Sequence, residues 1–535
     1  MKKAGLVSLF LLLIFSGFNY IESRNDKVDR SLRLYDAYFR TLMENYVDEL
    51  DPQIVIRKSI DATNASIDTY TRFFDSTETL DRTRQWQGIL YGGIGIDLID
   101  RNGSVLITGV KENYPAQKAA IFPGNIILSI DSNSIKGKQF AEVVNLIRGE
   151  VGTEVSFTLA NSTDTVIKKL VRVQVKSEPV PYSFLIDENT GYIKFNHFLK
   201  GSSNAFNESL IELKNKIKLK NLIVDLRGNS GGLVDEAVKL LSFFIPDGKE
   251  VCSLKGFNSG SNYSYYTSGN LADTTLFLIL LTDENTISAA EIFAGAIQDY
   301  DRAVIVGRTT FGKGLVQGTR FPGAGTSLYI TAARYYTPSG RGIHRFNKPN
   351  NFDRLFYSNN GRELKAEGGV SPDVFMDAKK VPPIIKSLEL SFLLFDYANY
   401  YKKLNPKIIN GTGFSFEDKV LNDFIKFVWE RQDELKLPSD KKLGELIEVL
   451  ITENQENPTS KEIEKLMQNM RNQKALMLKK YKKEIKVLLE REILKRYYYS
   501  SLIASREAQQ DELIQKSLSL FKDTVEYKKI LNLNK

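Results

Sequence analysis

The chain has 535 residues, of which 42% are apolar and 26% are charged, and its formal net charge is +8. This composition is typical of globular proteins and does not indicate long disorder, while the length predicts about three or four domains. No nucleic-acid-reading motif accompanies the basic balance, so we interpret it as a solvated basic surface. The only cysteine, Cys252, excludes an intramolecular disulfide and is expected to be a small buried side chain.

The N-terminus combines two lysines with an apolar run over residues 4–18. This pattern predicts a secretory signal within residues 1–22. The run is shorter than the roughly 20 residues that a membrane span needs. Because no small-x-small cleavage site stands out, an uncleaved anchor in the inner membrane is the alternative. We therefore expect an exported protein of the periplasm or cell envelope.

After the N-terminus, the pattern of apolar residues changes from helical spacing to strand-like alternation. Apolar residues recur at helical spacing between Leu32 and Val47, which predicts a helical N-terminal domain over residues 25–85. Residues 86–175 contain short alternating strands with glycine turns, and one helix near residues 139–148. This second segment is therefore expected to be a small, mainly β domain.

Residues 176–380 alternate between strand and helix patterns. Buried-type strands are predicted at residues 221–226, 275–281 and 303–307, and helices at 232–244 and 289–299. This alternation predicts an α/β domain with a central sheet flanked by helices. Residues 381–535 are strongly helical and lysine-rich, which predicts a helical C-terminal domain with a solvated basic face. The alternative is a surface that contacts an adaptor or an envelope partner.

Ser288 occupies the position between a predicted buried strand and a predicted helix. Residues 285–291 read NTISAAE, and a serine three residues before a glutamate also matches a helix capping box, which is the plain structural explanation. However, this position lies at the carboxyl edge of the sheet, where clefts form. The helix N-terminus that follows supplies N–H groups and a positive dipole end that could stabilise an oxyanion.

Lys313 lies between two glycines in residues 310–317, which read TFGKGLVQ. A serine nucleophile needs a base, and neither of the two histidines, His197 and His344, lies in a catalytic-looking frame. A lysine base must be neutral, although the pKa of free lysine is near 10.4, and apolar surroundings favour that form. Gln317 could orient the amine without adding charge. His344 is expected at the surface, and His197 could line the cleft.

A glycine-rich turn follows the first buried strand. Residues 225–232 read DLRGNSGG, and the absence of a closing Gly-Lys-Ser/Thr excludes a phosphate-binding P-loop. Its backbone N–H groups could complete an oxyanion hole with that of Ala289.

These frames together resemble the carboxyl-terminal processing (tail-specific) serine proteases. The similarity covers residues 30–380 and rests on several motifs in order: DLRGNSGG at 225, SAAEI at 288, QDYDRA at 298, TFGKG at 310, YTPSGR at 336 and GVSPD at 369. One departure is Ala290, where the family often has a second serine. The resemblance implies an α/β multidomain fold: a helical N-terminal domain, a PDZ module over 86–175, a crotonase-like protease core over 176–380 and a helical C-terminal domain.

The resemblance also implies the roles of single residues. Ser288 would be the nucleophile, Lys313 the general base and then the acid, and Gln317 the residue that orients the lysine. Gly231 and Ala289 would donate the oxyanion-hole N–H groups. Asp299 would be a structural acidic position. The implied reaction needs no cofactor and no metal.

The PDZ module implies recognition of apolar C-terminal tails of protein or peptide substrates. Its carboxylate-binding loop matches residues 91–96 (YGGIGI), so the expected contacts are Gly92, Gly93, Ile94, Gly95 and Ile96. A peptide would add there as a strand to the sheet edge. Two departures, Ala120 for a usual glycine and Asn125 for a usual aspartate, leave this expectation in place.

The sequence therefore predicts an exported serine endopeptidase with a Ser-Lys dyad, acting through an acyl-enzyme and without nucleic-acid partners. The alternative is a noncatalytic PDZ-containing peptide-binding scaffold with a decayed protease core. We also expect the PDZ module to gate the cleft.

Overall fold

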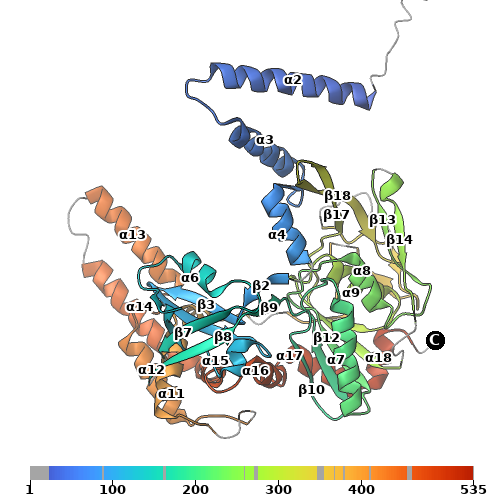
Figure 1. The fold of residues 1–535 in the computed structure, drawn as a ribbon. Helices are drawn as coiled ribbons and strands as arrows, with labels where there is room; N and C mark the ends of the chain where they lie inside the picture. Colours follow the sequence, from blue (N-terminus) through green and yellow to red (C-terminus); the bar gives the residue numbers. More distant parts are fainter. Residues whose placement is uncertain are drawn as a thin grey trace, which may run out of the picture. The chain divides into compact units, whose positions relative to one another are not determined.

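The computed structural model describes residues 23–86, 89–160, 164–257, 259–269, 275–345, 355–366, 368–377, 380–408, 411, 413–454 and 461–533. These residues form two compact units, one of residues up to 76 with 319–330 and one of residues 77–318 with 331–535 (Figure 1). The predicted signal or anchor in residues 1–22 lies outside the described residues. Among the helices of the described ranges, none has the length and apolar character needed to cross a bilayer.

The first unit combines two N-terminal helices with a small antiparallel ladder. Its elements are α2 (Arg24–Asn45), α3 (Pro52–Ile67), β1 (Arg72–Phe74) and the distal ends of β17 (Leu315–Gly323) and β18 (Thr326–Tyr336). Asp51 accepts hydrogen bonds from the N–H groups of Gln53 and Ile54, and Pro52 takes the first helical position, so α3 begins there. The helices agree with the sequence prediction, whereas the pairing of β1 with β18 was not predicted.

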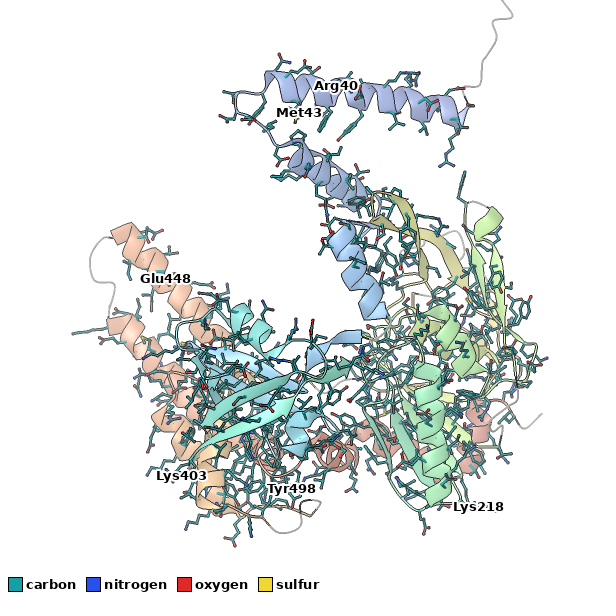
Figure 2. The ribbon with its side chains drawn as sticks, viewed as in Figure 1. Arg40, Met43, Lys218, Lys403, Glu448 and Tyr498 are labelled. Carbon is teal, nitrogen blue, oxygen red and sulfur yellow. The ribbon has the colours of Figure 1, made fainter. Side chains whose placement is uncertain are left out.

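Helix α2 is the most exposed element of this unit. None of its 22 residues, all of which are described, is buried. Arg40 pairs with Asp36 on the helix surface, and Figure 2 shows Arg40 and Met43 projecting from it. The helix follows the predicted apolar spacing without burying that face within its own unit.

The second unit begins with α4 (Ser76–Trp86) and a five-stranded antiparallel ladder. The strands, in spatial order, are β3 (Ile96–Arg101), β4 (Ser104–Val110), β5 (Ile126–Ile130), β7 (Glu154–Ala160) and β8 (Thr165–Val171), with short β6 (Asn133–Ser134) beside β5. Helices α5 (Pro115–Lys118) and α6 (Phe140–Ile147) accompany the sheet, and β2 (Ile89–Gly93) pairs with β9 (Val173–Lys176). The edge of β3 has no strand partner in the described residues, so it is open to an added strand.

The central sheet of the second unit is parallel apart from its first strand. Its order is β10 (Tyr182–Leu185), β11 (Thr190–Lys194), β12 (Asn221–Asp225), β15 (Phe277–Thr282), β16 (Val304–Gly307) and β21 (Val374–Phe375). One face packs against α7 (Ser202–Lys216), α8 (Val234–Leu241) and α9 (Ala289–Asp299). Alternate residues such as Val224 and Leu280 point into that core.

The opposite face of the central sheet is covered by the end of the chain. Helices α17 (Glu512–Lys522) and α18 (Thr524–Ile530) place Ile514, Phe521 and Tyr527 against the alternate strand residues, among them Ile223 and Ile279. Figure 1 shows both helices, in red, beside the strands of this sheet. The domain predicted over residues 381–535 thus contains two helices that pack on the predicted protease core.

A smaller sheet joins β13 (Glu250–Lys255) and β14 (Tyr263–Tyr266) to the proximal part of β18. A short 3-10 helix (Ser259–Ser261) connects β13 and β14, and β19 (Phe356–Tyr357) pairs with β20 (Glu363–Leu364). Cys252 in β13 is fully buried in the core of the α7–α9 face, as the sequence analysis expected.

The remaining C-terminal helices form their own apolar core. They are α10 (Pro383–Leu390), α11 (Leu393–Leu404), α12 (Asp418–Glu430), α14 (Lys461–Lys480), α15 (Lys482–Leu494) and α16 (Ser500–Ala508), whereas α13 (Pro438–Asn454) contributes no described residue to this core. The β3–β8 region is joined to these helices by ion pairs and ring contacts. Arg101 pairs with Asp396 at 2.6 Å, and Tyr499 stacks on Phe122 with ring centroids 4.7 Å apart.

Candidate active site

Ser288 is the N-cap residue of α9 and has an unusual backbone conformation. Its φ is 60° and its ψ is −117°, a region that residues with a Cβ rarely occupy. Such a conformation costs about 1–3 kcal/mol and persists where surrounding contacts enforce it. The side chain is half-buried. The predicted nucleophile therefore lies on a strained turn between β15 and α9.

Glu291 provides the contacts that enforce this turn. The side chain is fully buried, and its Oε2 accepts hydrogen bonds from the backbone N–H of Ser288 at 2.8 Å and of Lys313 at 2.9 Å. Its Oε1 accepts from the N–H of Gly312 at 2.7 Å and the hydroxyl of Thr310 at 2.6 Å. Burial raises the pKa of Glu291, although these hydrogen bonds favour the carboxylate form. The capping-box pattern predicted only the bond to Ser288.

Lys313 is thereby brought next to Ser288 at the level of the backbone, because both N–H groups bind one carboxylate oxygen. Its side chain is half-buried. Tyr335, which is buried, adds a second connection: its N–H donates to Gly314 O, and its hydroxyl donates to Ser288 O at 3.3 Å. The structure thus brings the backbones of the two predicted dyad residues together, and the dyad itself stays a prediction. Tyr335 was missed because nothing in the sequence marks it.

Gln317 lies on β17, four residues after Lys313. Its side-chain amide donates to the hydroxyl of Thr331 on β18 at 3.4 Å. This contact fixes the amide within the hairpin. Orientation of the Lys313 amine by Gln317 remains a prediction.

The glycine-rich loop over residues 225–232 lies directly against Ser288. A Cβ on Gly231 would stand 2.9 Å from both Ala289 N and Ser288 Cβ, so only glycine fits there. However, the Gly231 N–H donates to Asn229 Oδ1 at 2.8 Å. Asn229 is fully buried and its own amide donates to Phe195 O. Of the two predicted oxyanion donors, Gly231 is thus already engaged, and Ala289 lies buried at the first position of α9.

The start of this loop is an ion cluster. Asp225 is buried at the end of β12, where it accepts from Tyr192 and Lys194 and pairs with Arg227. Burial alone would raise the pKa of Asp225, but the charges of Arg227 and Lys194 outweigh this effect and lower it to about 2. The carboxylate therefore stays ionised and anchors the loop.

Both histidines lie near these segments. His197 Nδ1 is 3.5 Å from Ser230 Oγ, beside the glycine-rich loop, and His344 Nδ1 is 3.2 Å from Gly312 O. Each ring is half-buried, and burial lowers the pKa of both. His344 is therefore not the surface residue that the sequence analysis expected, because residues 343–345 return against the lysine loop.

Asp299 is held in a buried ion pair. Its Oδ1 lies 2.8 Å from Arg341 Nη2, its Oδ2 accepts the N–H of Ser339, and Asp299 and Arg341 are buried. This position joins the end of α9 to residues 339–341, which fits the structural role expected for Asp299. In the described part of the chain, no three His, Cys, Asp or Glu side chains gather closely enough to hold a metal ion.

A groove lies between β3 and α6, next to the predicted carboxylate-binding loop. Ile94, Gly95 and Ile96 line it on one side, and on the other side it is lined by Phe140, Val144, Ile147 and Arg148. Gly92 and Gly93 instead belong to β2, where they pair with residues of β9. Three of the five predicted contacts therefore line the groove. Ala120, which replaces a usual glycine, has a φ of 54°.

Comparison with known proteins agrees with this arrangement. Residues 189–349 match the model of peptidase family S41, residues 106–161 a PDZ domain, and residues 384–521 the C-terminal helical domain of probable PDZ-proteases. The part of the chain over residues 189–349 therefore resembles peptidase family S41. The fold class predicted from the sequence is confirmed, and the predicted enzyme class, a serine-type peptidase, agrees with this family.

Individual S41 relatives show how far the similarity extends. A probable CtpA-like serine protease of Staphylococcus aureus (strain COL) is 30% identical over 340 residues, which are 63% of this chain and 66% of that protein, just under two thirds of its length. A second probable CtpA-like serine protease, of Staphylococcus haemolyticus (strain JCSC1435), is 26% identical over 83% of this chain and 85% of the relative. A solved photosystem II D1 C-terminal processing protease is 25% identical, with a TM-score of 0.36, over 65% of this chain and 88% of that one.

Proposed function

We propose that this protein is a serine endopeptidase in which Ser288 is the nucleophile and Lys313 the general base. The observation that carries the proposal is the buried Glu291 carboxylate, which binds the backbone N–H groups of both residues. A single rigid acceptor holds two segments that are otherwise separate in the chain. This is the kind of preorganisation that a nucleophile–base pair requires.

The proposed reaction proceeds through an acyl-enzyme. Neutral Lys313 Nζ removes the proton from Ser288 Oγ while the oxygen attacks the scissile carbonyl carbon. The resulting ammonium then gives this proton to the leaving amine as the C–N bond breaks. Water, deprotonated by the same amine, attacks the ester carbonyl carbon. The ammonium returns this proton to Ser288 Oγ as the ester C–O bond breaks and the new carboxyl terminus is released.

The developing oxyanion would be stabilised at the N-terminus of α9. The Ala289 N–H and the positive end of the helix dipole supply one donor there. Gly231 would supply the second donor after its N–H leaves Asn229 Oδ1, to which it donates in the structure. We therefore propose that substrate binding shifts the glycine-rich loop before acylation.

Substrate selection is proposed to occur in the groove between β3 and α6. A C-terminal tail would add as a strand to the open β3 edge, with its carboxylate at residues 94–96. Phe140, Val144 and Ile147 give the groove an apolar wall, which favours apolar tails. We also propose export to the periplasm or cell envelope, based on the N-terminal lysines and apolar run.

The test compares the native protein with Ser288→Ala and Lys313→Ala on an unfolded substrate that ends in an apolar tail. Each variant should cleave at least about 1,000-fold more slowly than the native protein. Lys200→Ala, which removes an exposed lysine elsewhere, is the matched control and should cleave normally. The same substrate with a tail of aspartates should be cleaved poorly. Equal tail binding without cleavage by all forms would instead support the noncatalytic scaffold.

A further inference from the structure

The glycine-rich loop is contacted by a residue almost three hundred positions further along the chain. Arg227 Nη1 lies 2.7 Å from Oδ2 of Asp511, the residue before α17. Both side chains are 25% exposed, so the pair is partly shielded from water. An ion pair in this setting is stronger than a fully exposed one, which typically contributes little.

Arg227 is constrained on two sides by this contact. Its Nη2 pairs with Asp225 Oδ2 at 2.6 Å and its Nε contacts the same carboxylate, while Nη1 is left for Asp511. The planar guanidinium thus bridges the end of β12 and the start of α17. Its orientation is therefore defined by two carboxylates on separate elements.

Asp511 divides its two carboxylate oxygens between separate tasks. Oδ1 accepts the N–H groups of Leu513 at 2.9 Å and Ile514 at 3.2 Å, which caps α17. Oδ2 is the atom that pairs with Arg227. A helix cap needs only one acceptor oxygen, so capping alone does not explain the second contact.

The residues that follow Arg227 lead directly to the nucleophile. The Gly228 N–H donates to Asp283 Oδ1, Asn229 O accepts the Ile287 N–H, and Gly231 packs against Ser288. Only three residues separate Arg227 from Gly231, along a loop that is bonded to residues 283 and 287 just before Ser288.

We propose that Asp511 is a positioning residue for the oxyanion-forming loop, acting through Arg227. This inference rests on the proposed function, because it assigns the loop over residues 228–232 to the oxyanion hole. The C-terminal helix would then contribute to the geometry of the active site as well as to the core. Asp511 touches neither substrate nor nucleophile.

The variant Asp511→Asn separates the two tasks of the side chain. Asparagine caps a helix as well as aspartate does, so α17 should stay intact. Its amide cannot replace the carboxylate opposite Arg227, since it lacks the charge. The matched control is Asp523→Asn, because Asp523 caps α18 through the Glu526 N–H in the same way. Asp511→Glu, which restores the charge on a longer side chain, is the rescue variant.

We expect kcat of Asp511→Asn to fall by about 5- to 10-fold, as for a coupling of moderate strength, with KM nearly unchanged. Amide hydrogen exchange across residues 226–233 should be faster than in the native protein. Asp511→Glu should recover part of kcat, and Asp523→Asn should match the native protein in kcat, KM and loop exchange. Asp511→Asn should have a Tm only slightly below that of Asp523→Asn, because it alone loses an ion pair.

The proposal is overturned if Asp511→Asn matches Asp523→Asn in kcat and in loop exchange, or if kcat falls only in proportion to a loss of Tm. Failure of the proposed function would look different, since the native protein would then cleave no faster than Ser288→Ala. In that case, the exchange measurement still decides whether Asp511 holds the loop, because it does not depend on turnover.

Discussion

The two faces of the central sheet are covered by helices of very different origin. On one face lie α7, α8 and α9, which alternate with the strands between residues 202 and 299. On the other lie α17 and α18, which follow the strand β21 by more than 130 residues of helical chain. The comparison teaches that a core can be interrupted by a whole helical domain and completed by the end of the chain.

The sequences of the central strands already indicate that both faces of the sheet are buried. Residues 222–224 and 278–281 are continuous apolar runs, which are typical of strands buried on both sides. The local βα alternation accounts for only one layer of helices. Chain order alone could not say that the second layer comes from residues 512–530.

The largest effect is expected from removing one large aromatic side chain on each face. Phe293→Ala on α9 and Phe521→Ala on α17 should each lower the free energy of unfolding by about 3–5 kcal/mol, because each leaves a cavity in a packed core. Urea unfolding measures both values. A loss below about 1 kcal/mol for Phe521→Ala would mean that α17 is not part of this core.

A smaller loss of stability is expected from removing a tyrosine hydroxyl, and this loss should be larger on the α17–α18 face than on the other face. The buried Tyr527 hydroxyl donates to Leu278 O at 2.8 Å and accepts the Leu278 N–H at 3.1 Å. Tyr527→Phe removes both of these buried hydrogen bonds and should cost about 1–3 kcal/mol. The control is Tyr300→Phe on the other face, which removes one partly buried bond to Glu250 O and should cost about 1 kcal/mol or less. Equal losses would contradict this assignment.

The strained turn at Ser288, on the α9 side, predicts that a glycine there increases stability relative to alanine. Ser288→Gly should be more stable than Ser288→Ala by about 1 kcal/mol, because glycine adopts a φ of 60° without strain. Both variants lack the Ser288 hydroxyl, so thermal unfolding compares them directly. If Ser288→Gly is the less stable of the two, the turn is not strained in solution.

The smallest effect concerns the pH dependence of stability, and we expect it only for the α7–α9 face of the sheet. Ile343, next to His344, packs in that core, and the chain has no histidine beyond residue 344. Burial lowers the pKa of His344 below its usual 6.5, so the unfolded chain takes up the proton first. The stability that neutral His344 contributes is therefore complete when the pH lies above the pKa of the unfolded chain. It is lost as the pH falls from that value through the lower pKa of the folded chain. His344→Gln should reduce the drop in Tm between about pH 7.5 and about pH 5.5; an unchanged drop would contradict the assignment.

Much of the site could be predicted because its residues lie in short contiguous frames. Ser288, Lys313 and the glycine-rich loop were recognised from local motifs, and the structure brings their backbones together. Glu291 was seen as a helix cap, yet its bonds to Gly312 and Lys313 depend on a tertiary approach. A capping pattern describes contacts within one turn and carries no information on a segment twenty residues away.

Other features could not be predicted for related reasons. Gly92 and Gly93 look like part of a binding loop, but their pairing with β9, eighty residues later, places them in a strand. The half-burial of His344 and the contact between Asp511 and Arg227 likewise depend on segments that meet only in the folded chain. Contacts between distant segments produce no local periodicity or characteristic spacing in the sequence.

The cover supplied by α17 and α18 has a consequence for the order in which the molecule is made. During synthesis, the strands β10 to β21 leave the ribosome long before the helices that shield their second face. A nascent chain therefore carries an exposed apolar surface until residues 512–530 have been added. A transcript cut short before residue 512 would yield a product that holds every predicted catalytic residue but leaves one apolar face of the central sheet uncovered.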